Sequence, residues 1–388
     1  MGAYMEVFVF LIAVIFALLC GLIYILPYVI PLVIIIVVIV AIGACISMGK
    51  VNKLIRNITE ELDSVMTNQP IDAVITWVDG NDERHKAKRM KYGNEIIFNA
   101  EDIAGSSRFA SLGEIFYCVA SLNRYAPWIN KIYIVTDEQD PHLEEFLAKH
   151  FPEGHIPVEI VDHKVIFRGY EHCLPTFNSI SIESMTWRIP GLSDHFIEFN
   201  DDLILAAPVS PEDFFTEDGK VVCYGKRRLQ FFVRLSRLLK YRSDGSKRVS
   251  FKESMLNAAE LANHHNRFIM LYHTPKALLR SAYERYYAAH PEALLRNISH
   301  RFRHATQYNP EEVHYLMLEE EGRCTITDAN KELFYFMSKP DMAYIRRKLE
   351  CFTRAQGKKF GCFNSLDQAP EEGQKMVIDW IEHRLQLR

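Results

Sequence analysis

Three segments of the chain that resemble buried strands end in acidic residues. Asp79 follows "ITWV", Asp137 follows "YIVT", and the pair Asp201 and Asp202 follows "FIEFN". In an open α/β sheet, ligands bind outside the carboxyl ends of the strands, so these side chains are expected along one edge. Carboxylate oxygens, completed by the phosphate oxygens of a substrate, are ligands that Mg²⁺ prefers. The pattern therefore indicates a metal-dependent enzyme that acts on a nucleotide diphosphate.

The polar segment Asn200-Asp201-Asp202 separates two apolar runs. Asn and Asp are poor strand residues and adjacent carboxylates repel each other, so the segment is either a turn or a cation site. Both aspartates face one site only if the chain turns there, because successive side chains of a strand point to opposite faces. We expect one carboxylate on Mg²⁺ or Mn²⁺, with the other sharing the ion or held by backbone N–H groups. Taken alone, Asp79-Gly80 after a strand is more typical of a turn.

Strands and helices are predicted to alternate between residues 70 and 200. The strand patterns are "IDAVITWV", "KIYIVTD", "IPVEIVD" and "HFIEF", and the helical patterns are "SLGEIFYCVASLNRY", "PHLEEFLAKH" and "SISIESMTW". This alternation predicts an α/β domain with a mainly parallel sheet. Ser111 and Glu114 have the spacing of a capping box at the start of the first helix.

The character of the chain changes between residues 226 and 252, where ten Lys or Arg residues occur with a single acid, Asp244. In this basic segment, "RRLQFFVRLSRLLKYR" interleaves Phe and Leu with Arg, which suits a helix that lies on anionic lipid or holds an anionic substrate. The alternative is a solvated basic face packed on the core. Farther on, "YHTPKALLRSAYERYY", "PEEVHYLMLEEE" and "GQKMVIDWIEHRLQ" have helical patterns. The second half is therefore predicted to be mostly helical.

Residues 7–48 contain no charged side chain. A bilayer span takes about 20 helical residues, so this apolar run is about twice the length of one span. Pro27 and Pro31 interrupt its middle, where they would kink or end a helix. Two membrane passes are therefore predicted, at residues 7–26 and 30–48, and one long bent helix is the alternative.

Charge and cysteine content narrow the class of protein. The formal net charge of -4 gives no reason to expect a nucleic-acid partner, and eight cysteines without C-x-x-C spacing indicate neither a zinc site nor a disulfide framework. Three cations follow the second apolar segment and favour a cytoplasmic C-terminal side: Lys50, Lys53 and Arg56.

Several long stretches resemble the conserved regions of the Stealth family, bacterial capsular and exopolysaccharide sugar-1-phosphate transferases related to the animal N-acetylglucosamine-1-phosphotransferase. The first two regions are matched over about residues 71–215 by "IDAVITWVDGND", "RFASLGEIFYCVASLNRYAPWINKIYIVTD" and "LPTFNSISIESMTWRIPGLSDHFIEFNDDLILAAPVSPEDFF". "YHTPKALL" and "HRFRHA" are similar to the third region. The fourth is faint around "KKFGCFNSLDQ", where the family has an Asn-Asp pair. Here Asn364 is followed by Ser365 and Leu366 before Asp367, so this region is assigned no catalytic role.

The resemblance implies a nucleotide-sugar-binding core of Rossmann or GT-A-like layout. It implies that an acceptor hydroxyl attacks the β-phosphate of a nucleotide-diphospho-sugar, which releases the nucleoside monophosphate and leaves a phosphodiester. The matching positions give the catalytic residues Glu183, Asp202, His273 and Arg303. The metal ligands are then Asp201 and Asp202, and weaker substrate contacts are expected from Asp79, Arg108, Asn178 and Arg188.

The implied roles agree with the chemistry of the side chains. Phosphoryl transfer needs positioning and charge neutralisation, which suits Asp202 as a metal ligand and Arg303 as a planar fork for phosphate. Glu183 could take the acceptor proton or bind the metal. His273 could be the general base or a phosphate partner, because histidine titrates near neutrality. In "RFRH" the alternative to Arg303 is that Arg301 faces inwards.

The expected organisation is a transmembrane segment, a linker and a phosphotransferase domain, at residues 1–50, 51–70 and 71–388. The domain would comprise an α/β core, the basic segment and a mostly helical part that completes the site, at residues 71–225, 226–252 and 253–388. Expected partners are a nucleotide-diphospho-sugar donor, a polysaccharide or lipid-linked glycan acceptor, the membrane and capsule-assembly proteins. The catalytic domain is expected on the cytoplasmic side of a bacterial inner membrane. The alternatives are a metal-dependent glycosyltransferase and an inactive scaffold in a capsule-assembly complex.

Overall fold

The computed structural model describes residues 7, 10–11, 69–93, 112–240, 250–355 and 357–388. The chain divides into two compact units, Met1–Asn68 and Gln69–Arg388. The two predicted membrane passes lie outside the described residues except for Val7, Phe10 and Leu11, so they stay a prediction. Of the helices that the structure describes, none is long and apolar enough to cross a membrane.

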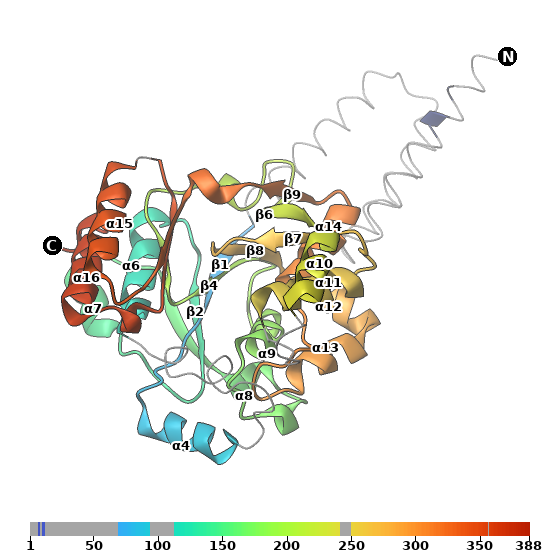
Figure 1. The fold of residues 1–388 in the computed structure, drawn as a ribbon, viewed down its shortest axis with the longest axis horizontal. Helices are drawn as coiled ribbons and strands as arrows, with labels where there is room; N and C mark the ends of the chain where they lie inside the picture. Colours follow the sequence, from blue (N-terminus) through green and yellow to red (C-terminus); the bar gives the residue numbers. More distant parts are fainter. Residues whose placement is uncertain (1–6, 8–9, 12–68, 94–111, 241–249, 356) are drawn as a thin grey trace, which may run out of the picture. The chain divides into compact units, whose positions relative to one another are not determined.

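A five-stranded sheet lies at the centre of the second unit, with the strand order β3-β2-β1-β4-β8 (Figure 1). Four strands are parallel: β1 (Ile71–Thr76), β2 (Ile132–Thr136), β3 (Val158–Asp162) and β4 (His195–Asn200). The fifth, β8 (Lys276–Leu279), runs antiparallel to β4. The prediction of a mainly parallel sheet is therefore confirmed. Every residue of β2 is buried, as expected for a central parallel strand covered on both faces.

Helices alternate with the strands of the first half, as predicted. The predicted helical patterns contain α6 (Glu114–Tyr125), α7 (Glu144–His150) and α9 (Ser179–Glu183), whereas α4 (Glu83–Lys91) and α8 (His163–Ile166) were not predicted. The predicted capping box is wrong, because α6 begins after Gly113 and Glu114 is therefore its first residue rather than its third. Gly113 has φ 87°, a left-handed conformation that glycine adopts without a steric penalty. The carboxylate of Glu114 instead accepts a hydrogen bond from Leu112 N at 2.6 Å.

The second half contains strands that the sequence patterns did not predict. One three-stranded sheet consists of β6 (Val221–Leu229), β7 (Arg267–Leu271) and β9 (Cys324–Thr327), and another of β5 (Leu203–Leu205), β10 (Leu333–Met337) and β11 (Phe360–Asn364). The segment "YHTPKALL", predicted to be helical, holds β8 instead, and α12 (Arg280–Ala289) begins after it. Periodicity alone does not separate a short buried strand from a helix, which explains the error.

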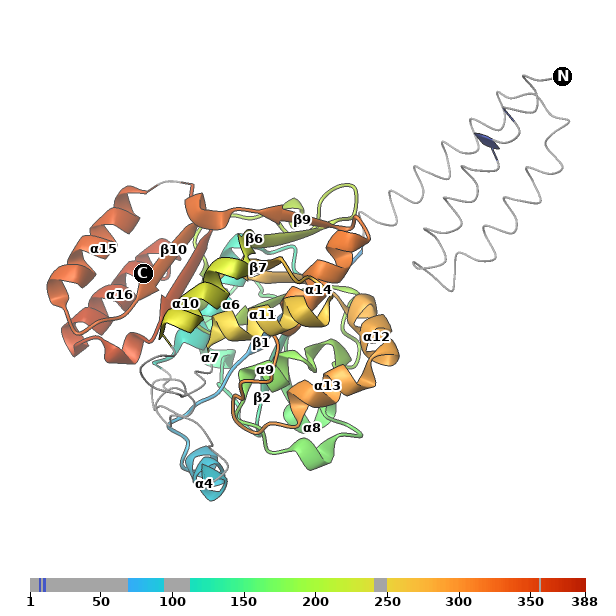
Figure 2. The same ribbon diagram turned by 45° about the vertical axis from the view of Figure 1, so that its right-hand side comes forward.

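The helices of the second half cover these sheets. They are α10 (Gln230–Lys240), α11 (Phe251–Leu261), α12, α13 (Pro291–Ile298), α14 (Pro310–Glu320), α15 (Met342–Arg354) and α16 (Glu371–Arg384). Figure 2 shows α15 and α16 beside β10 at one end of the unit. Phe334, Phe336 and Phe363 from the small sheet join Ile345 and Ile381 from these two helices in one apolar cluster.

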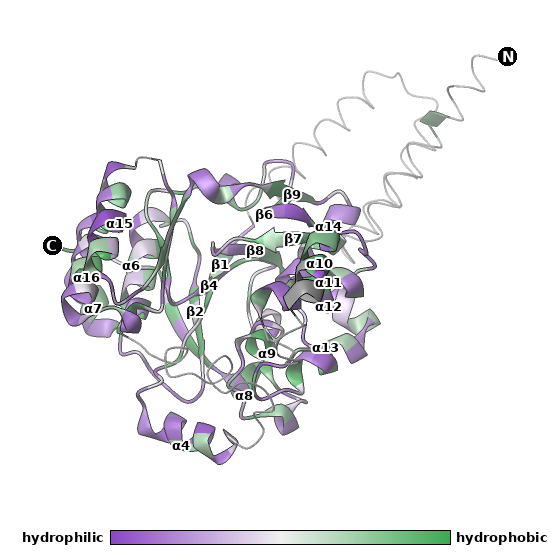
Figure 3. Cartoon of the chain, in the orientation of Figure 1, coloured by the Kyte–Doolittle hydropathy of each residue, from purple (hydrophilic) through white to green (hydrophobic). Residues whose placement is uncertain are grey.

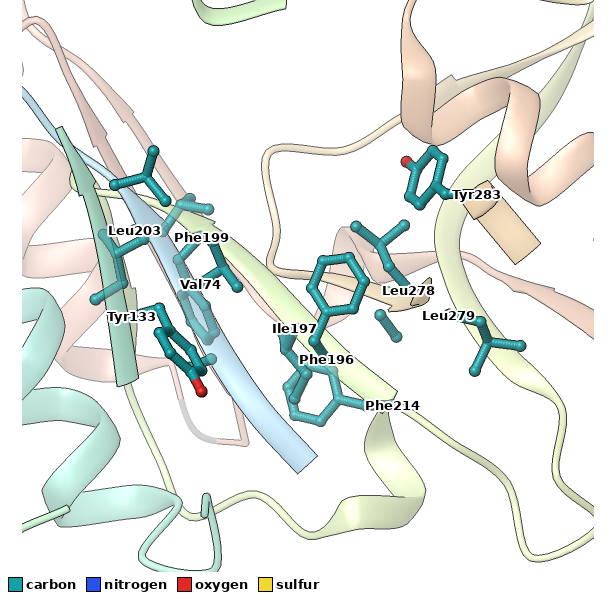
Figure 4. Close-up of a cluster of buried hydrophobic side chains, with 14 of the residues drawn as sticks. Val74, Tyr133, Phe196, Ile197, Phe199, Leu203, Phe214, Leu278, Leu279 and Tyr283 are labelled. Carbon is teal, nitrogen blue, oxygen red and sulfur yellow. The ribbon is translucent and has the colours of Figure 1, made fainter. Parts of the chain in front are cut away.

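The main core packs the central sheet against the C-terminal half. Figure 4 shows Phe196 and Ile197 of β4 beside Leu278 of β8, with Tyr283 from α12 above them. Figure 3 shows hydrophobic residues along the central strands and hydrophilic residues on much of α4. Because β4 lies inside this core, the turn that follows it has a rigid support.

Phe196→Ala is expected to lower the free energy of unfolding by about 3–5 kcal/mol, because it removes a fully buried ring and leaves a cavity. Urea unfolding followed by intrinsic fluorescence measures this change. Met90→Ala is the control, because Met90 is exposed and its loss is expected to change stability by less than about 0.5 kcal/mol. A loss below about 1 kcal/mol for Phe196→Ala would contradict this packing.

Candidate active site

A cavity of about 670 Å³ opens at the carboxyl edge of the central sheet. The ends of the parallel strands line it with Trp77 after β1, Asp137 after β2, His163 after β3 and Asp202 after β4. Because β8 is antiparallel to its neighbour, its first residue, Lys276, lies at the same edge. This is the location in which open α/β sheets bind ligands.

The cavity brings together all four residues that were predicted to be catalytic, together with the second predicted metal ligand. These residues are Glu183, Asp201, Asp202, His273 and Arg303. They come from α9, the turn between β4 and β5, the loop before β8 and the segment after α13. Residues distant in the sequence therefore converge on one space, although their roles in a reaction stay predictions.

The chain turns at Asp201 and Asp202, between β4 and β5. Because of this turn, both side chains line the cavity although they are neighbours in the sequence. Burial raises the pKa of Asp201 well above its ordinary value and also raises the pKa of Asp202. Cys362 Sγ contacts Asp202 Oδ2 at 3.6 Å, and Phe363 N donates to the Asp202 carbonyl at 3.0 Å. The segment is thus a turn that places two carboxylates at the cavity, and a cation bound there stays a prediction.

A second group of carboxylates lies in the same cavity. Glu183, Glu198 and Glu311 are buried, and each offers an oxygen within 4.8 Å of the others. Burial, followed by the neighbouring Glu311, raises the pKa of Glu183 to about 8. Burial also raises the pKa values of Glu198 and Glu311. One oxygen of Glu198 accepts a hydrogen bond from Thr186 Oγ1 at 3.1 Å, while its other oxygen and one oxygen of Glu311 have no described partner.

Glu198 and Glu311 were not among the predicted site residues. The sequence does contain an indication of a functional role for Glu198, because this residue interrupts the apolar strand "HFIEF". Fully buried glutamates are rare unless they are paired. The sequence contains no such indication for Glu311, since an acidic residue in the first turn of a helix is common and usually exposed. All of these ligand atoms are oxygens, so the carboxylate set fits Mg²⁺ or Mn²⁺.

Two half-buried cations, Lys276 and Arg303, line the same cavity as the carboxylates. Lys276 Nζ donates to the carbonyl oxygens of Tyr272 and Thr274, each at 2.6 Å, and Arg303 donates to Ser179 Oγ at 2.8 Å. Neither cation forms an ion pair with any residue in the described part of the chain. Burial lowers the pKa of both groups. Glu183 attracts both cations, and Glu311 attracts Lys276, from beyond ion-pair distance; an anionic ligand such as a phosphate would interact with both cations more directly.

His273 is held between two aromatic rings. Its ring lies 5.5 Å from that of Phe251 and 5.2 Å from that of Tyr335, and both pairs are stacked. Burial, with a further contribution from the charge of Lys276, lowers the pKa of His273 to about 4. The imidazole is neutral at pH 7, which is the form that a general base requires.

Three predicted substrate contacts do not line the cavity and have structural hydrogen bonds instead. The Asn178 side chain donates to the His300 carbonyl and to Gln307 Oε1. The Arg188 guanidinium donates to the carbonyls of Ile166 and Arg168. Asp79 Oδ1 accepts from Asn81 N at 2.8 Å, which is the hydrogen bond of a local turn. A fourth predicted contact, Arg108, lies outside the described residues.

Arg303 and its alternative, Arg301, lie in different places, and the segment of the fourth conserved region reaches the cavity. Arg303 lines the cavity, whereas Arg301 donates to the carbonyl oxygens of Cys173 and Pro175 and holds that loop. The segment that was assigned no catalytic role ends in the cavity, where Asn364 and Asp367 are among the lining residues. Residue spacing gave no signal for this placement, because β11 reaches the site only through the tertiary fold.

Comparisons with known proteins agree with the sequence motifs. The model of Stealth protein conserved region 1 matches residues 69–96, and that of conserved region 2 matches residues 108–223. The exopolysaccharide phosphotransferase SCO6021 of Streptomyces coelicolor is 38% identical over 249 residues, which are 62% of this chain and 42% of the relative. The capsular polysaccharide phosphotransferase WcwK of Streptococcus pneumoniae is 41% identical over 149 residues, or 38% of this chain and 42% of the relative. This chain thus spans less than half the length of either relative.

Another relative is matched over more of its length. The capsular polysaccharide phosphotransferase fcs1 of Haemophilus influenzae is 33% identical over 260 residues, which are 64% of this chain and 66% of the relative. Solved structures include mouse xyloside xylosyltransferase 1, with a TM-score of 0.36 and 10% identity over 76% of this chain and 98% of its own. WbbM, a bifunctional glycosyltransferase, has a TM-score of 0.41 and 10% identity over 82% of this chain and 50% of its own. At these TM-scores the structural likenesses carry no argument. The two conserved regions and the sequence relatives show that the chain belongs to the Stealth family.

Proposed function

We propose that this protein transfers a sugar 1-phosphate from a nucleotide-diphospho-sugar to a sugar hydroxyl of an acceptor, forming phosphodiester linkages in a capsular or exopolysaccharide. The observation that carries the proposal is that one cavity holds buried carboxylates and two half-buried cations, neither of which lies within ion-pair distance of an acid among the described residues. Phosphoryl transfer needs this combination, because the protein mainly positions the reactants and neutralises charge. Names of the relatives as polysaccharide phosphotransferases support the reaction class.

The predicted site residues and Lys276 have distinct roles in the proposed reaction. Arg303 and Lys276 bind the phosphate oxygens of the donor, since their N–H groups form charge-assisted hydrogen bonds. Asp201 and Asp202 would hold Mg²⁺ or Mn²⁺, which neutralises charge on the diphosphate when bound. His273 takes the proton of the acceptor hydroxyl, because its ring is neutral and fixed. Glu183 is protonated at neutral pH when its pKa is about 8, so it is better suited to hydrogen bonding than to proton abstraction.

We also propose that the uncharged residues 7–48 anchor the protein in a bacterial inner membrane, with the catalytic domain in the cytoplasm. Nucleotide-sugars and a polysaccharide or lipid-linked acceptor would meet there, and capsule-assembly proteins would be its partners. The length of the run and the cations after it support this arrangement.

Asp202→Asn is expected to lower the rate of transfer by at least about a hundredfold, because it removes a metal-binding charge. The assay incubates the protein with nucleotide-sugars and capsule oligomers, then measures nucleoside monophosphate release and the phosphorus NMR signal of a diester. Asp218→Asn is the matched control, since Asp218 is an exposed loop residue paired with Lys220. Release of nucleoside diphosphate alone would indicate a glycosyltransferase instead. Unaltered polymer in cells that carry Asp202→Asn would indicate a scaffold.

Lys276→Met is expected to lower kcat by about 10- to 100-fold, because Lys276 binds the carbonyls on both sides of His273 and fixes its position. Loss of the neighbouring charge also raises the pKa of His273 from about 4 towards its ordinary value. The acid limb of the pH profile of kcat/KM then moves to higher pH. Lys375→Met on the exposed face of α16 is the control. A lower kcat with an unchanged pH profile would show that Lys276 has only a structural role.

A further inference from the structure

Four large apolar side chains are exposed where β6 ends and α10 begins. Leu229 is 46% exposed, Phe231 65%, Phe232 64% and Leu235 41%. The two phenylalanine rings contact each other edge to face, with centroids 5.7 Å apart. We name these four residues the α10 surface. Contiguous exposed apolar side chains of this kind mark interaction sites in soluble domains.

The orientation of α10 is fixed by contacts on its other side. Gln230, the first residue of the helix, is buried and donates to the carbonyl oxygens of His264 and Arg267. Arg234, one turn later, bonds to Gln230 Oε1 and to Glu260 on α11. Both views of the ribbon show α10 beside α11 (Figures 1 and 2). The helix therefore cannot rotate to bury Phe231 and Phe232 without losing these hydrogen bonds.

Cations surround the α10 surface. Lys226, Arg227, Arg228 and Arg234 are all exposed. Three of them pair with acids on other elements: Lys226 with Asp328, Arg227 with Glu319 and Arg234 with Glu260. Arg228 pairs with no acid among the described residues. Exposed ion pairs contribute little free energy, so these cations remain available to a stronger anionic partner.

We propose that the α10 surface docks on an anionic lipid bilayer, with Phe231 and Phe232 among the headgroups and the surrounding cations on lipid phosphates. An amphipathic helix with Phe and Leu on one side and Lys and Arg beside them has the chemistry of an interfacial helix. The basic segment as a whole holds ten cations and one acid, which matches the negative surface of such a bilayer. The inference does not depend on the proposed reaction.

A second copy of the chain fits the surface less well. In a twofold dimer the same patch meets itself, so the cations of one copy would face the identical cations of the other. Like charges placed opposite each other across an interface oppose association. Anionic lipid, in contrast, would be attracted by these cations.

The test places the full chain in lipid nanodiscs made of phosphatidylcholine alone or of phosphatidylcholine with phosphatidylglycerol. Hydrogen exchange of the amides in residues 226–240 is expected to be at least about fivefold slower in the anionic discs, and high salt is expected to remove the difference. Phe231→Ser with Phe232→Ser is expected to abolish the protection. Met90→Ser with Met337→Ser, which changes exposed residues elsewhere, is expected to preserve it.

Two results would overturn the proposal. One is equal exchange of residues 226–240 in the wild-type protein in both kinds of disc, a comparison that needs no variant to fold. The other is protection in lipid-free detergent that grows with protein concentration, which would identify a second copy as the partner. Unchanged hydrogen exchange in β1 and β4 shows that the variants are folded. Release of nucleoside monophosphate in the transfer assay tests the proposed reaction separately from membrane binding.

Discussion

Repulsion among buried carboxylates is the constraint on which the site depends. Glu183, Glu198 and Glu311 are buried in one cavity, and burial raises the pKa of each. Asp201 and Asp202, which are half-buried at the same cavity, also have raised pKa values. Removing an ionised carboxylate from water is costly unless a cation or a hydrogen bond compensates. A fold does not maintain such a cluster unless the surrounding elements hold each member firmly, and a ligand that supplies positive charge would relieve the cost.

The sheet provides that rigidity. Parallel strands place their carboxyl ends at one edge, so Asp137 and Asp202 share a cavity although they are far apart in the sequence. The antiparallel β8 is the exception that completes the site, because its direction brings an amino end, and with it Lys276, to the same edge. Lys276 then fixes the loop that carries His273. One strand reversal thus supplies both a cation and the position of the candidate base.

The sequence predicted what depends on local pattern. Alternating strands and helices gave the parallel sheet, and the strand-end position of Asp202 placed it correctly at the cavity. The family motifs supplied Glu183, His273 and Arg303, which periodicity could not have found. Lys276, Glu311 and Asp367 were missed because their elements reach the cavity only through tertiary packing. Asn178 and Arg188, which the matched motifs suggested as substrate contacts, hydrogen-bond to loop carbonyls and do not line the cavity, so that role stays a prediction.

The charge balance of the cavity links cation binding to protons. The carboxylates that line the cavity outnumber Lys276 and Arg303, so they would repel one another if all were ionised. Glu183, with a pKa of about 8, instead retains a proton at neutral pH and lowers this repulsion. A divalent cation that binds the carboxylates would compete with such protons, because metal ligands have to be deprotonated. The affinity of the cavity for a cation is therefore expected to rise with pH as Glu183 titrates. The carboxylates that are costly to bury without a counter-charge are thus also the groups that would bind the proposed cation, while Lys276 and Arg303 would contact the phosphates of the proposed donor.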